Sequence, residues 1–249
     1  RMSDRPIHCE SSQTDRSSLY ILLGGMLGLV VVMGIGRFAF TPILPLMQRD
    51  LGMSNTVAGW LAGLNYLGYL GGAVLCSCAP QLLRSRLLTG GSLLLSLATT
   101  LFMGFTLSVF WWGLMRLVGG FASAVVFIVV SAEVGEALTR RGYGHWVGAL
   151  YGGVGLGIAL SGVLVPQLDK VGGWSSSWIG MGMLATLLAI SGIALGRKRS
   201  LVQPITISTT AHAGSLKSVR LLAVAYFFEG LGYIVTATFV VAIISVTPG

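Results

Sequence analysis

The stretch GIGRFAFTPILPLM, from Gly34 to Met47, places an arginine, a threonine and two prolines inside an otherwise apolar segment. An arginine at the centre of a membrane-spanning helix costs about 2.5–3.5 kcal/mol, as much as several leucines return. Ionisable residues inside a membrane are therefore functional candidates by default. Arg37 is the first candidate site residue of this chain.

The composition of the whole chain supports a membrane environment for this stretch. Hydrophobic residues make up 54% of the chain, charged residues only 10%, and the mean hydropathy is +0.82. Soluble domains are about 25% charged. The net charge of +8 does not indicate a nucleic-acid partner, because the basic residues lie in short gaps between apolar runs. The expected partner is the lipid bilayer.

Crossing a hydrocarbon core of about 30 Å takes about 20 helical residues. The sequence predicts an all-α transmembrane bundle with seven such helices, over residues 19–47, 56–79, 87–107, 109–132, 146–168, 175–195 and 219–246. The predicted domains are a cytoplasmic tail (1–18), a six-helix part (19–195), a cytoplasmic linker (196–218) and a further helix within 219–249. The three cysteines, Cys9, Cys76 and Cys78, lack the spacing of a zinc site, and we predict no metal and no cofactor.

The distribution of lysine and arginine predicts the orientation of the chain. With the N-terminus in the cytoplasm, twelve basic residues lie on the cytoplasmic side, and only Arg49 and Lys170 lie outside. Arg37 and Arg116 lie within predicted helices and complete the 16 basic residues. Short loops rich in basic residues stay cytoplasmic, so we expect a multi-pass protein with a cytoplasmic N-terminus.

Three charged residues lie well inside predicted helices: Arg37, Arg116 and Glu229. A planar guanidinium suits a carboxylate or a phosphate, and an intramembrane glutamate suits a proton carrier. Two structural alternatives stay open. Arg37 and Glu229 could pair to hold two helices together, and Arg116, which lies closer to a helix end, could extend its side chain to the membrane surface.

Polar side chains on two helices extend the candidate substrate- or proton-binding set. Asn65, Tyr66 and Tyr69 lie within 56–79, and Tyr233 lies within 219–246. Their amide and phenol groups could meet a substrate, although buried tyrosine and asparagine also hydrogen-bond to neighbouring helices.

Prolines and glycines predict how the helices bend and pack. Pro42 and Pro45 are expected to break the first helix near its outer end and so release backbone carbonyls. Small residues four positions apart allow helix backbones to approach closely. Four glycine pairs have this spacing: Gly59 and Gly63, Gly68 and Gly72, Gly148 and Gly152, and Gly153 and Gly157.

MGIGRFAFTPILPLM (33–47), followed by GMSNTVAGWLAGLNYLGYLGG (52–72), resembles the YbfB/YjiJ-like bacterial branch of the major facilitator superfamily. RLVGGFASA (116–124) and GALYGGVGLGIALSG (148–162) are similar to the fourth and fifth helices of that superfamily. The resemblance implies two six-helix halves in a bacterial inner membrane, with a central cavity lined by the first, fourth and seventh helices. It also implies a missing second half, since the chain ends after the seventh predicted helix.

The predicted function is secondary active transport of an unidentified small solute, driven by protons, with the arginines favouring an anion. We predict no enzyme, because His8, His145 and His212 all lie outside the predicted helices. No lysine is placed to hold retinal, and GxxxxGK[ST], which would indicate a nucleotide-driven pump, does not occur. The alternative is a truncated, non-transporting fragment or a membrane assembly partner.

Overall fold

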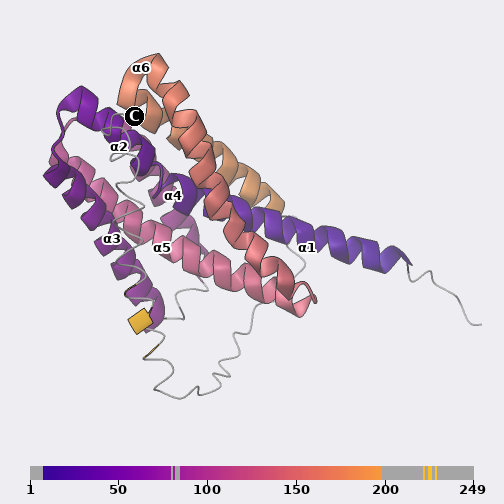
Figure 1. Ribbon diagram of the computed structural model, residues 1–249. Helices are drawn as coiled ribbons and strands as arrows, with labels where there is room; N and C mark the ends of the chain where they lie inside the picture. Colours follow the sequence, from indigo (N-terminus) through magenta and orange to yellow (C-terminus); the bar gives the residue numbers. More distant parts are fainter. Residues whose placement is uncertain are drawn as a thin grey trace, which may run out of the picture. The chain divides into compact units, whose positions relative to one another are not determined.

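The computed structural model of the protein describes residues 8–79, 81, 85–197, 221, 224–225 and 228. Within these residues the regular elements are all helices, and none is a strand (Figure 1). This confirms the all-α class for the described part of the chain. The linker predicted at 196–218 and the helix predicted at 219–246 lie almost entirely outside it, so the count of six helices plus a seventh stays a prediction.

The helical elements follow one another through the described chain as α1 (His8–Leu29), η1 (Val30–Ile35), α2 (Phe40–Leu51), α3 (Asn55–Cys78), α4 (Arg86–Phe102), η3 (Met103–Phe105), α5 (Val109–Arg140), η4 (Gly144–Trp146) and α6 (Val147–Arg197). Among the residues that the structure describes, five stretches are long and apolar enough to cross a membrane: Arg16–Leu51, Asn55–Cys78, Arg86–Phe105, Val109–Arg140 and Gly144–Leu195. In the bundle, α3 packs along α5, and α1 packs along α6.

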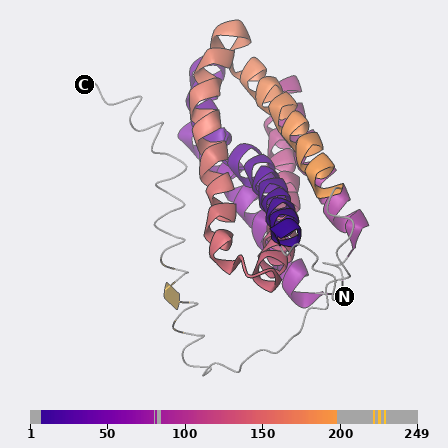
Figure 2. The same ribbon diagram turned by 90° about the vertical axis from the view of Figure 1, so that its right-hand side faces the viewer.

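The last stretch is 52 residues long, about twice the length that one crossing requires. It reverses direction at Gly172 and Gly173, as Figure 2 shows. Gly173 has a φ of 69°, a left-handed conformation that residues with a Cβ seldom adopt. The hydroxyl of Ser177 donates to the carbonyl of Val165 at 3.4 Å and so links the two arms. The turn lies in the gap predicted between helices 146–168 and 175–195.

The first spanning segment, Arg16–Leu51, is broken, but not where the sequence indicated. It passes from α1 into η1, a π-helix, and is interrupted at residues 36–39. Pro42 and Pro45 lie inside α2, so the predicted break at the prolines is wrong in position. Pro42 has no N–H to give to the carbonyl of Phe38, and Thr41 donates to that carbonyl instead, at 3.0 Å. Pro42 therefore changes the hydrogen bonding of the turn that precedes it.

Two helices extend beyond the predicted membrane limits. α1 begins at His8, so much of the tail predicted at 1–18 is helical. α5 continues to Arg140, past the predicted end at 132, and Arg140 forms an ion pair of 2.6 Å with Glu136 one turn earlier. Once a helix has formed, each further residue adds a backbone hydrogen bond at little cost, so a helix can continue past its apolar segment. Hydropathy therefore does not indicate the residue at which the helix ends.

Close packing uses only some of the predicted glycine pairs. A Cβ on Gly68 would lie 1.9 Å from the carbonyl oxygen of Leu117 in α5, and one on Gly157 would lie 2.6 Å from the Cα of Gly34. A Cβ on Gly72 or on Gly153 would also collide with a neighbouring helix. The pairs Gly59 and Gly63, and Gly148 and Gly152, have nothing within 4 Å. Spacing alone therefore identified candidate pairs but not the faces on which helices meet.

Candidate functional site

Arg37 lies in the turn between η1 and α2, where the first spanning segment is broken. Its guanidinium carbon is 4.2 Å from the ring centroid of Tyr69 and 4.7 Å from that of Tyr66. These tyrosines are three positions apart on α3, so they lie on one face of that helix. The structure brings three predicted site residues together, with the positive charge over the electron-rich faces of two rings.

Arg116 joins this group from α5. Only 5% of its surface is exposed. Its Nη1 donates to the carbonyl oxygen of Arg37 at 3.5 Å, and its guanidinium carbon is 4.4 Å from the ring centroid of Phe40. The alternative in which Arg116 reaches the membrane surface is therefore wrong. In the described part of the chain, no carboxylate forms an ion pair with Arg116.

The contact between the two arginines depends on the helix break. In an unbroken helix the carbonyl of residue 37 would accept from the N–H of Thr41. Here Thr41 donates to Phe38 instead, at 3.0 Å, and the carbonyl of Arg37 faces Arg116. The carbonyl that faces Arg116 belongs to Arg37, whose donor in an unbroken helix would be Thr41 and not a proline. The release of a carbonyl by the prolines therefore stays a prediction.

Asn65 is nearly fully buried on α3 and faces a different neighbour from the tyrosines. Its Nδ2 donates to the carbonyl of Arg116 at 2.8 Å. The backbones meet closely here, since a Cβ on Gly120 would lie 2.1 Å from the carbonyl oxygen of Asn65. The amide therefore joins α3 to α5, which was one of its two predicted roles, while Tyr66 and Tyr69 contact Arg37.

Two predicted site residues, Glu229 and Tyr233, lie outside the described residues. The ion pair expected between Arg37 and Glu229 stays a prediction. Among the described residues, no three His, Cys, Asp or Glu side chains are grouped so as to hold a metal ion.

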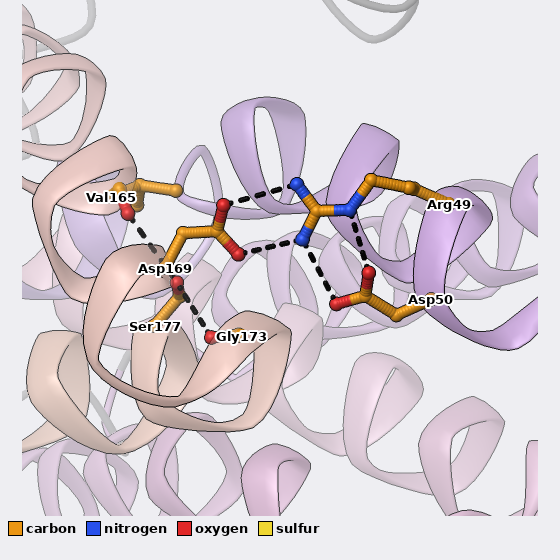
Figure 3. Close-up of polar contacts among 6 residues, drawn as sticks. All are labelled: Arg49, Asp50, Val165, Asp169, Gly173 and Ser177. Carbon is orange, nitrogen blue, oxygen red and sulfur yellow. Dashed lines mark hydrogen bonds and ion pairs between the residues drawn. The ribbon is translucent and has the colours of Figure 1, made fainter.

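A second polar cluster joins α2 to the first arm of α6 (Figure 3). Arg49 donates to both carboxylate oxygens of Asp169, at 2.9 and 3.1 Å, and to both of Asp50, at 2.6 and 3.1 Å. The Arg49 side chain is 56% exposed. In the sequence, Arg49 indicated only the orientation of the chain, and its two carboxylate partners were not predicted. Arg49 and Asp169 each follow an apolar predicted helix at its outer end. This shared position is the feature of the sequence that could have identified the pair.

The fold and the site together define a multi-pass helical membrane protein with two arginines directed into its bundle. A family model described as "Uncharacterised MFS-type transporter YbfB" matches residues 29–248, and the chain belongs to this family of MFS-type transporters. The resemblance in the sequence to the YbfB-like branch is confirmed. Comparison with curated proteins and with solved structures gives no match.

Proposed function

We propose that the chain is part of a secondary active transporter that moves a small anion across the bacterial inner membrane by alternating access. Membership of a transporter family supports transport itself. The choice of an anion rests on one observation. The guanidinium of Arg37 is held 4.2 and 4.7 Å from two tyrosine rings beside a break in a membrane helix.

The rings stabilise a cation that the membrane disfavours. A charged side chain at the bilayer centre costs about 2.5–3.5 kcal/mol on insertion scales, and a desolvated cation–π contact returns about 2 kcal/mol. The faces of the Tyr66 and Tyr69 rings stabilise the Arg37 cation although they carry no formal charge themselves. A site of this kind attracts a carboxylate or a phosphate, whose oxygens match the geometry of a guanidinium.

Arg116 has a different proposed role. It lies deeper, and it contacts the backbone and a ring rather than the tyrosine pair. We assign it to positioning, because its bond to the carbonyl of Arg37 holds the broken turn that carries the Arg37 side chain. Its charge also adds to the positive potential that an anion would meet.

Proton coupling is assigned to Glu229. Protonation of Glu229, or competition of an anion for Arg37, would favour one access state over the other. In proteoliposomes of the full-length transporter, Glu229→Gln should abolish gradient-driven uptake and retain exchange of bound solute. Gradient-driven uptake at the wild-type rate would contradict this role.

Thermal unfolding of the purified full-length protein tests the anion site directly. Sodium acetate, sodium benzoate and sodium phosphate serve as probes, with sodium chloride at matched ionic strength as reference. At least one probe should raise the unfolding temperature of the wild type, because a ligand that binds only the folded state stabilises it. Arg37→Ala should lose this increase, and Arg49→Met, the matched control, should retain it. Equal stabilisation of Arg37→Ala would contradict the site.

A further inference from the structure

A small cavity of about 10 Å³ lies beside the candidate site, where residue 36 of the broken turn meets α3, α4 and α5. Among the residues that line it are Gly36, Asn65, Thr99, Thr100 and Arg116. Its volume is close to the least that holds one water molecule, and it is far too small for a metabolite. The cavity is therefore not a binding site for a transported solute.

Two buried polar atoms belong to residues that line this cavity. The Nε of Arg116 and the Oδ1 of Asn65 have no hydrogen-bond partner within the described part of the chain. Both side chains are more than nine-tenths buried, at 5% and 2% exposure. The orientation of the Asn65 amide follows from its Nδ2, which donates to the carbonyl of Arg116, so Oδ1 is the remaining acceptor.

The chemistry of the lining selects the ligand. Arg116 Nε is a donor and Asn65 Oδ1 is an acceptor, so the ligand must both accept and donate a hydrogen bond. A halide ion would satisfy the arginine but would face the lone pairs of the amide oxygen. A metal cation would be repelled by the guanidinium. Cavities that stay empty are apolar, and this one is lined by an arginine, an amide and two hydroxyls.

We propose that one water molecule is bound here, accepting from Arg116 Nε and donating to Asn65 Oδ1. A threonine hydroxyl completes its shell. Thr99 and Thr100 both donate to the carbonyl of Ser96, at 3.0 and 2.8 Å, so their oxygens retain lone pairs. Three hydrogen bonds are typical of a buried water. This inference does not depend on anion transport.

The bound water gives the Arg116 guanidinium a second fixed contact, at Nε, beside its bond to the backbone at Nη1. Nη1 is held by the carbonyl of Arg37, and Nε is held through the water by Asn65. The water therefore links the broken turn, α3 and α5, and it fixes the direction of the Arg116 guanidinium.

X-ray radiolysis of the full-length protein, read by mass spectrometry, tests the proposal. Hydroxyl radicals formed from a bound water oxidise nearby methionine to the sulfoxide. Met103 lines the cavity and is 2% exposed, whereas Met181 is 0% exposed and does not line it. Met103 should be oxidised several-fold faster than Met181. Equal rates would overturn the proposal.

Substitutions of the residues proposed to bind the water test whether the oxidation rate of Met103 depends on that water. Asn65→Leu removes the acceptor and should lower the Met103 rate towards that of Met181. Thr99→Val combined with Thr100→Val should do the same if Asn65→Leu does not fold. Thr186→Val is the matched control, because its hydroxyl also donates to its own helix, at 2.8 Å, away from the cavity. A Met103 rate that both cavity variants leave unchanged would overturn the assignment, as would a high-resolution structure of the full-length protein with another group bonded to Arg116 Nε.

Discussion

Two arginines of this protein show opposite ways of placing a cation. Arg49, at the end of α2, is 56% exposed and donates to two carboxylates, Asp50 and Asp169. Arg116, inside the bundle, is 5% exposed, and its described partners are a backbone carbonyl and an aromatic ring. The fully paired arginine is in contact with solvent, and the buried one has no ion pair in the described part of the chain.

This contrast in burial and pairing indicates which of the two arginines has a functional role. An exposed ion pair contributes little to stability, because water and salt screen it. A buried cation without a carboxylate is costly, and an apolar residue of similar size would often stabilise the fold better. Arg116 is therefore expected to serve binding or positioning at the expense of stability, and Arg49 to have a minor structural role.

The largest effect is expected for the side of the membrane on which each loop lies. The Arg49 cluster is predicted to lie outside, so labelling of a nearby residue from outside should be complete or absent. In a background without Cys9, Cys76 and Cys78, Lys170→Cys should react with an impermeant thiol reagent added to intact cells. His145→Cys should react only after the membrane is opened. Both positions are exposed, so access to the side chain is matched. The reverse pattern would invert the predicted orientation.

Arg116→Met should separate function from stability. Removing the charge and the bond to the carbonyl of Arg37 should lower transport by more than about tenfold, since a hydrogen bond to a charged group contributes about 1.5–3 kcal/mol. The unfolding temperature should stay level or rise. Uptake into proteoliposomes and thermal unfolding of the same preparation provide the two readings. A large loss of stability with transport intact would show that Arg116 is a structural residue.

Gly68→Ala should destabilise the bundle by about 1–3 kcal/mol, because the new Cβ would lie 1.9 Å from the carbonyl oxygen of Leu117. Gly63→Ala lies on the same helix with nothing within 4 Å, and it should leave stability nearly unchanged. Thermal unfolding in one detergent compares the two variants. Equal effects would place the contact between α3 and α5 elsewhere.

Arg49→Met should give the smallest effect. The unfolding temperature is expected to fall less than for Gly68→Ala, and the difference from the wild type should shrink at about 1 M salt, where charges are screened within about 3 Å. Transport should continue at the wild-type rate. Loss of transport in this variant would move the functional site towards the predicted outer surface.

Much of the site could be predicted because its residues are unusual for their environment. Arg37 and Arg116 were found as charges inside apolar helices. Asn65, Tyr66 and Tyr69 were found as polar side chains on one predicted helix, but the sequence did not indicate which of them contact Arg37. For Asn65, a hydrogen bond to a neighbouring helix was predicted as one alternative, but its partner, the carbonyl of Arg116, was not. The pairing of Arg49 with Asp169 joins residues that are 120 positions apart, and neither local pattern nor composition encodes such a distance.

The sequence alone determined the class of the protein, because long apolar stretches leave few alternatives to membrane helices whose backbone groups are all paired. It also determined the turn at Gly172 and Gly173, where only local backbone freedom matters. Three features followed only from the packing of the helices: the position of the break in the first spanning segment, the glycines that meet a neighbouring helix, and the inward direction of Arg116. Each of these depends on atoms that distant segments bring within a few ångströms, and the energies that choose among them arise only when the helices pack.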